Sequence, residues 1–122
     1  MKLDHTLVPA EDKEASARFF AKIMGLEYAG IDGDCGIVRV DDALLLRFDE
    51  RRANRVHLAF HVTSDEFDGV MGRLQADSVA FGPRAGTSDG QEGIFNGGRR
   101  LYFDAPGGLN VELMTVATAG LA

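Results

Sequence analysis

The chain has 122 residues, the size of one compact domain with a single core. It is 45% hydrophobic and 26% charged, so it is too apolar for a disordered tail, and no apolar run approaches the ~20 residues of a membrane-spanning helix. Nineteen acidic against 13 basic residues give a net charge of −6, which disfavours nucleic acid and anionic membranes as partners.

The first half of the chain predicts a strand, a helix and three further strands. Residues 3–9 alternate as in a strand that stops at Pro9, and residues 10–24 place apolar side chains at three- and four-residue steps before Gly25, a suitable C-cap. Three short strand-like runs separated by Asp- or Gly-containing turns follow at 26–29, 36–40 and 43–48.

The second half repeats this order. It predicts a strand at 55–62, a helix with Ser64 as N-cap, a strand at 79–81, a polar loop at 82–98, and strands at 99–103 and 109–115. His5 and His57 lie in the first strand of each half, 52 positions apart. The sequence therefore predicts one α+β domain of two βαβββ modules, at about 1–52 and 53–122.

The faces of the strands differ in polarity. In the strand at 55–62 the even-numbered residues are apolar, whereas the opposite face carries His57 and His61. In the last strand Val111 and Leu113 share one face, and the opposite face carries these residues: Asn110, Glu112 and Met114. A curved mixed sheet with helices on its apolar side and a polar cavity on the other accounts for both patterns.

Three of these residues are candidate metal ligands: His5, His57 and Glu112. Imidazole nitrogen and carboxylate oxygen suit divalent Mn, Fe, Co, Ni or Zn, and three protein ligands leave coordination positions open for a substrate. Taken singly, each residue is also compatible with an ordinary role, as a half-buried strand histidine or a solvated edge carboxylate.

Three segments resemble the signature strands of the vicinal oxygen chelate (VOC) superfamily, which includes glyoxalase I, extradiol dioxygenases and bleomycin-resistance proteins. They are Leu3–Val8, Val56–Val62 and Leu101–Leu113, the last containing the pattern aromatic-Asp-x-Pro-x-Gly-x-Asn-x-Glu. The resemblance covers essentially the whole chain. It implies paired βαβββ modules that curl round a divalent metal held by His5, His57 and Glu112. It also implies a homodimer, whose site is built either within one chain or from His5 of one chain and the other two ligands of its partner.

One departure from the family narrows the expected activity. Glyoxalase I takes a fourth ligand from the last strand of its first module, where this chain has Leu46 or a neighbour, and leucine binds no metal. We therefore expect a three-ligand metalloenzyme that polarises adjacent oxygens of a small metabolite or antibiotic, of the lyase, isomerase, thiol transferase or dioxygenase type. The alternative is a protein that binds an antibiotic or metabolite without catalysis.

The layout of the family implies which residues surround the metal. Arg100 and Tyr102 are expected to face the cavity and favour an anionic or oxygen-rich substrate, and His61 and Tyr102 are the candidate catalytic groups. Surface positions are the alternatives for Arg100 and His61. Three more residues are expected to contact substrate: Asn110 as a polar group, and Leu44 and Leu46 as an apolar wall.

Two other features bear on the site and on the compartment. The loop at 82–98 is long and polar, which is typical of a segment that gates a pocket. Cys35 is the only cysteine and behaves as a small hydrophobe rather than a nucleophile. Because Cys35 has no disulfide partner and residues 1–5 do not resemble a signal segment, a cytoplasmic location is expected.

Overall fold

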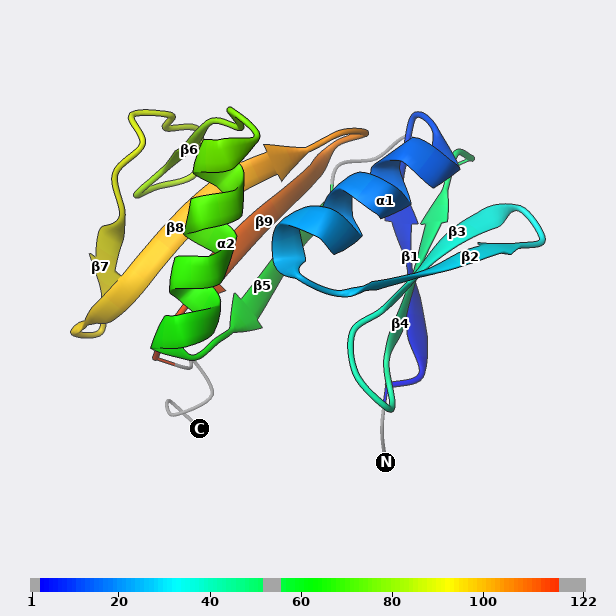
Figure 1. Ribbon diagram of the computed structural model, residues 1–122, viewed down its shortest axis with the longest axis horizontal. Helices are drawn as coiled ribbons and strands as arrows, with labels where there is room; N and C mark the ends of the chain where they lie inside the picture. The colour runs from blue at the N-terminus through cyan, green and yellow to red at the C-terminus, as the bar shows by residue number, and fades with distance from the viewer. Residues whose placement is uncertain (1–2, 52–55, 117–122) are drawn as a thin grey trace. The chain divides into compact units, whose positions relative to one another are not determined.

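The computed structural model describes residues 3–51 and 56–116, which fold as two units (Figure 1). The first consists of Met1–Val56 with Ala105–Leu109, and the second of His57–Asp104 with Asn110–Ala122. The expected strand start at Arg55 and the expected module boundary at 52–53 lie outside the described residues.

Each unit contains one helix and one mixed sheet. The elements of the first are β1 (His5–Pro9), α1 (Lys13–Met24), β2 (Glu27–Asp32), β3 (Cys35–Arg39) and β4 (Leu45–Asp49). Those that follow are β5 (Val56–His61), α2 (Ser64–Ala76), β6 (Phe81–Gly82), β7 (Gly93–Phe95), β8 (Gly98–Ala105) and β9 (Leu109–Met114). The sheets have the orders β1-β4-β3-β2 and β5-β9-β8-β6, with β7 added beside β8. The matching orders confirm the α+β fold built from a repeated βαβββ pattern.

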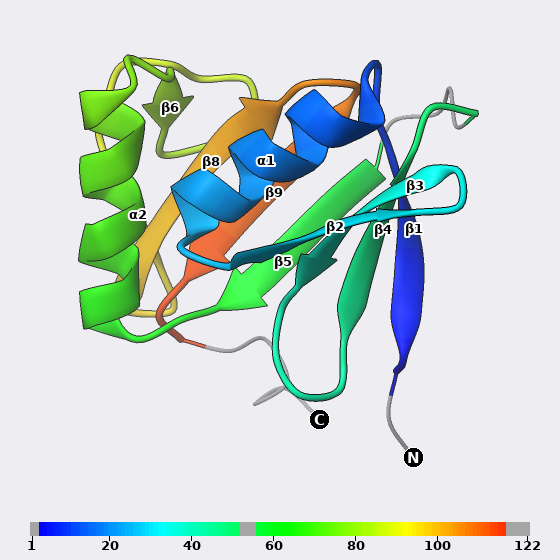
Figure 2. The same cartoon turned by 45° about the vertical axis from the view of Figure 1, so that its right-hand side comes forward.

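Helix α1 lies on the sheet of its own unit (Figure 2). It begins three residues later than the periodicity predicts, because the Asp12 carboxylate accepts hydrogen bonds from the amides of the first turn and so acts as the N-cap. It ends at Gly25 as predicted, with a left-handed φ of 71°. At Gly36 of β3 a Cβ atom would overlap the Lys13 carbonyl oxygen, so only glycine allows this close packing.

Helix α2 is capped by Thr63, not by Ser64 as predicted. The Thr63 hydroxyl accepts from the Glu66 amide at 3.1 Å, and the Glu66 carboxylate accepts from the Thr63 amide at 2.9 Å. This reciprocal pair is a capping box, which needs a Glu or Gln three residues after the cap. Thr63 meets that condition and Ser64, followed at the same spacing by Phe67, does not.

The segment at 82–98 is more ordered than the predicted loop. Its last part forms a hairpin in which β7 pairs antiparallel with β8, from Gly93 opposite Arg100 to Phe95 opposite Gly98. Asn96 and Gly97, with φ of 50° and 78°, make the tight turn that twisted hairpins favour. Gly82 belongs to β6 and pairs with Tyr102, so residues 83–92 are the part of the segment that lies between strands.

The position of Leu46 does not support its expected place in an apolar wall around the substrate. Leu46 is 1% exposed in the core of the first unit, on the same face of β4 as Phe48. Arg47 takes the opposite face, in register with Leu7 of β1, and its guanidinium pairs with Asp32 at 3.1 Å. Since neither leucine nor arginine binds a divalent metal, this position still offers no fourth ligand.

In the part of the chain that the structure describes, neither helix has the length and hydrophobicity needed to cross a bilayer.

Candidate metal centre

Strand β9 divides the second sheet into an apolar and a polar face. Leu109, Val111 and Leu113 are fully buried, whereas Asn110 and Glu112, at the alternate positions, lie on the other face. On the neighbouring strands the same polar face carries three further residues: His57 from β5 and Arg100 and Tyr102 from β8. The period-two alternation predicted from the sequence therefore brings five of the candidate residues together.

His57 lies between two oxygen atoms from β9. Its Nδ1 is 2.7 Å from Asn110 Oδ1, and its Nε2 is 3.1 Å from Glu112 Oε1. The His57 side chain is half exposed, whereas the Glu112 side chain is 11% exposed. The pair thus forms the edge of an accessible polar site whose carboxylate is largely shielded from water.

Tyr102 and Arg100 complete the cluster. The Tyr102 ring centroid is 6.2 Å from that of His57, and the Arg100 guanidinium lies 5.3 Å from the Tyr102 ring and 5.4 Å from the Phe95 ring. The buried Arg100 Nε has no hydrogen-bond acceptor within residues 3–51 and 56–116. Burial, a hydrogen bond to Glu112 and the charge of that carboxylate raise the pKa of the Tyr102 phenol.

Tyr102 is expected to ionise above the ordinary tyrosine pKa of about 10. The unfolded chain then loses this proton at a lower pH than the folded chain, so the free energy of unfolding falls as the pH rises above about 10. An absorbance titration of metal-free Tyr28→Phe protein isolates Tyr102, since the chain has two tyrosines and no tryptophan. Adding Glu112→Gln lowers the midpoint because it removes the nearby negative charge; an unchanged midpoint contradicts the assigned cause.

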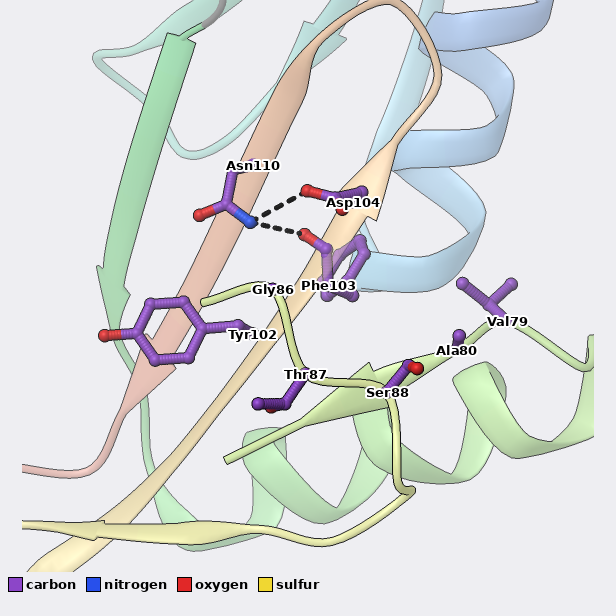
Figure 3. A pocket seen from close by; sticks show the side chains of 9 residues that line it. All are labelled: Val79, Ala80, Gly86, Thr87, Ser88, Tyr102, Phe103, Asp104 and Asn110. Atoms are coloured by element: carbon purple, nitrogen blue, oxygen red, sulfur yellow. Dashed lines mark hydrogen bonds between the residues drawn. The ribbon is translucent and has the colours of Figure 1, made fainter. Parts of the chain in front are cut away.

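A pocket of about 270 Å³ adjoins the polar face (Figure 3). Tyr102, Asp104 and Asn110 line it from the strands, and the remaining lining residues are Val79, Ala80, Gly86, Thr87, Ser88 and Phe103. The 86–88 part of the expected gating loop therefore does border a pocket. This volume lies just below the range of about 300–1,000 Å³ for drug-sized ligands, so it suits a small molecule or one ring of a larger one.

His61 lies apart from this cluster on the same strand. It comes four positions after His57, which places it about 13 Å further along β5. Its Nε2 is 3.3 Å from the backbone carbonyl oxygen of Thr115, to which it donates in the matching tautomer. The expected role of His61 as a catalytic base beside the metal has no support from these contacts.

His5 and Leu44 belong to the first unit. His5 is exposed, and its Nδ1 lies 2.8 Å from the Asp4 carboxylate. Within the described ranges, no group of three His, Cys, Asp or Glu side chains is close enough to hold a metal ion. The contacts thus unite two of the three expected ligands, His57 and Glu112, and leave the role of His5 a prediction.

The donor set on the second sheet fits a divalent metal. Asn110 engages His57 Nδ1, so that Nε2 is the nitrogen directed at a carboxylate oxygen. A metal-bound histidine commonly has this arrangement, with one nitrogen coordinating and the other hydrogen bonded. From the sequence, Asn110 is expected to bind substrate, and Asp104 is not singled out. The Asp104 carboxylate accepts a hydrogen bond from the Asn110 amide at 2.9 Å. The sequence does show that Asp104 and Asn110 lie on either side of the predicted turn between the last two strands, which indicates that their side chains can be close.

Comparison with solved structures finds matches over nearly the whole chain, and two of those above 30% sequence identity are oxidases. Oxidase ChaP-H2 matches with a TM-score of 0.87 and 34% sequence identity, covering 96% of this chain and 94% of that chain. Oxidase ChaP-H1 matches with a TM-score of 0.86 and 33% identity, covering 96% and 97%. A glyoxylase/bleomycin resistance protein/dioxygenase domain from Frankia sp. has the same fold, with a TM-score of 0.69, 20% identity and coverage of 96% and 98%.

The chain belongs to the vicinal oxygen chelate superfamily. No family model matches the sequence, and no curated protein matches it. The resemblance inferred from the three signature strands is therefore confirmed. The sequence identity to ChaP-H2, 34%, is well above the 20% identity to the Frankia domain. The similar structures include two that are named as oxidases.

Proposed function

We propose that this VOC protein is a metal-dependent oxidase that binds a divalent, redox-active metal through His5, His57 and Glu112. The observation that carries the proposal is the contact between His57 Nε2 and Glu112 Oε1 at 3.1 Å, with His57 Nδ1 already bonded to Asn110. His5 is included on its place in the first signature strand alone. The likeness to ChaP-H2 and ChaP-H1 favours oxidation over the lyase and transferase chemistries of other VOC proteins.

When bound, the metal supplies a Lewis acid that polarises adjacent substrate oxygens and exchanges electrons. The chain's own residues position and stabilise the substrate. Tyr102, kept protonated by its raised pKa, donates a hydrogen bond at the cluster, and Arg100 adds positive charge beside it. A phenol donor and a guanidinium together favour a substrate that carries or develops negative charge on oxygen.

Oxygen consumption tests the proposal. The protein is loaded with Fe²⁺ without oxygen and then mixed with aerated buffer and a panel of small catechols, hydroxyketones and α-keto acids. We expect substrate-dependent oxygen uptake that disappears when a chelator removes the metal. Metal-dependent conversion of a hemithioacetal without oxygen uptake supports a lyase instead. Tight substrate binding with no turnover and no metal requirement supports the metabolite-binding alternative and overturns the proposal.

The proposal includes a homodimer in which His5 comes from one chain and His57 with Glu112 from the other. Its support is the family resemblance of the signature strands. Mixing refolded His5→Ala and Glu112→Ala chains distinguishes the arrangements, since a mixed dimer regains one intact site only if ligands are shared between chains. Sedimentation of a fully metal-loaded monomer contradicts this part of the proposal.

A further inference from the structure

We propose that Asn110, held in place by Asp104, sets the tautomer of His57 so that the proton sits on Nδ1 and the lone pair on Nε2. Asn110 is then a positioning residue that acts on a metal ligand through a hydrogen bond. The tautomer itself follows from contacts within the second unit. Its benefit for metal binding rests on the proposed function.

The orientation of the Asn110 amide is the first step. Its Nδ2 lies 2.9 Å from Asp104 Oδ1 and 3.4 Å from the Phe103 carbonyl oxygen (Figure 3). Both of these oxygens can only accept hydrogen bonds while Asp104 is ionised, so the amide must present its NH₂ group to them. The reverse orientation places the amide oxygen against two acceptors. Asp104 thereby directs Asn110 Oδ1 toward His57.

The proton on His57 is the second step. Asn110 Oδ1 is an acceptor only and lies 2.7 Å from His57 Nδ1, so Nδ1 carries the hydrogen. In a neutral ring the lone pair is then on Nε2, 3.1 Å from Glu112 Oε1. Two acceptors facing each other at this distance attract a cation between or beside them.

The competing tautomer explains why the bond matters. If Nε2 carried the hydrogen, it would donate to Glu112 and the pair would close on itself, while the Nδ1 lone pair would face Asn110 Oδ1. A hydrogen bond of ordinary strength shifts the ratio of two such tautomers by about five-fold. Asn110 thus opposes the internal His57–Glu112 hydrogen bond that would otherwise compete with a metal.

Nitrogen-15 spectroscopy of metal-free protein tests the tautomer directly. Spectra are recorded at about pH 8, where an ordinary histidine is neutral, and the His57 signals are identified by their loss in His57→Gln. We expect a proton on Nδ1 of His57 in the unmodified chain and a shift toward Nε2 in Asn110→Ala. A proton on Nε2, protons on both nitrogens, or an unchanged spectrum in Asn110→Ala overturns the proposal.

Exchanging the two partners provides a rescue. In the double variant Asp104→Asn/Asn110→Asp a carboxylate accepts from both His57 Nδ1 and the new amide, so the Nδ1 proton is expected to return. Asn110→Asp alone sets two carboxylates against each other and is expected to recover less. If Asn110→Ala fails to fold, Asp104→Ala perturbs the same chain of bonds from its exposed end. Asp68→Ala, which removes a carboxylate bonded to Arg99, controls for the lost charge.

Calorimetry with Zn²⁺ alone gives the second readout. Loss of a residue that orients a metal-binding histidine commonly weakens metal binding by about 10- to 100-fold. We expect a loss in that range for Asn110→Ala and a return to within a few-fold in the double variant. If the tautomer responds as expected but even the unmodified protein binds no Zn²⁺, the proposed function fails while the role of Asn110 in setting the tautomer stands.

Discussion

Replacing Glu112 by glutamine is expected to weaken divalent metal binding by more than about 100-fold. Loss of a residue that only orients a metal ligand commonly weakens binding by about 10- to 100-fold, and loss of the ligand itself is expected to cost more. Glutamine keeps the size of the side chain but replaces a charged oxygen ligand by a neutral amide. Glu112 is the carboxylate within reach of His57, and its side chain is only 11% exposed. The measurements are metal content after purification without chelator and calorimetric titration with Mn²⁺.

Two comparisons make the result specific. His57→Gln is expected to cause a similar loss of metal, because it removes the nitrogen ligand of the same pair. Glu14→Gln serves as a matched control: Glu14 is a half-exposed carboxylate of α1 that lies 3.9 Å from Arg18. Unchanged metal content in folded Glu112→Gln protein rules out Glu112 as a ligand and with it the proposed metal centre.

The site on the second sheet was largely readable from the sequence because its strands alternate. In β5 and β9 every polar residue lies on one face and the other face is wholly apolar, which fixes the face of His57 and Glu112 without knowledge of the fold. The aromatic-Asp-x-Pro-x-Gly-x-Asn-x-Glu pattern then specifies the hairpin that carries Glu112. Both signals are local. The structure has His57 within reach of Glu112 and contains the β8–β9 hairpin.

Strand β4 shows why the first unit was less readable. Leu44, Leu45 and Leu46 are consecutive apolar residues, so no alternation indicates which of them faces the core. A shift of one residue moves every side chain of a strand to the other face, and the sequence left open whether Leu46 or a neighbour faces the site. The structure puts Arg47, in register with Leu7 of β1, on the face opposite to the buried Leu46. The pairing between strands, which is a tertiary feature, resolves this ambiguity.

Contacts between side chains form a second class that sequence reasoning missed. The bond from His57 to Asn110 joins residues 53 positions apart, and its function depends on Asp104 fixing the amide. By contrast, the capping box at Thr63 and the turn at Asn96 and Gly97 were present as local patterns and were overlooked. Local motifs of this kind can be predicted from the sequence, whereas a hydrogen bond between distant residues leaves no local pattern.

Replacing Phe20 by alanine is expected to destabilise the fold by about 3–5 kcal/mol. Phe20 is fully buried between α1 and the sheet of its unit, and its ring centroid lies 5.6 Å from that of Phe48, which is also fully buried. Truncation removes this aromatic pair and leaves a cavity that the closely packed helix at Gly36 has little freedom to fill. Chemical denaturation followed by circular dichroism measures the loss.

Phe19→Ala is the matched control, since it makes the same change one position earlier on α1, at a side chain that is only partly buried. It is expected to lose less than half as much stability, because less apolar surface leaves water there and no enclosed cavity forms. Equal losses at the two positions contradict the assigned face of α1. Because a domain of this size has a total stability of about 5–15 kcal/mol, Phe20→Ala consumes much of it. A loss of metal binding in Phe20→Ala would therefore reflect unfolding of the protein. For this reason the variants of the metal ligands must keep the core residues unchanged.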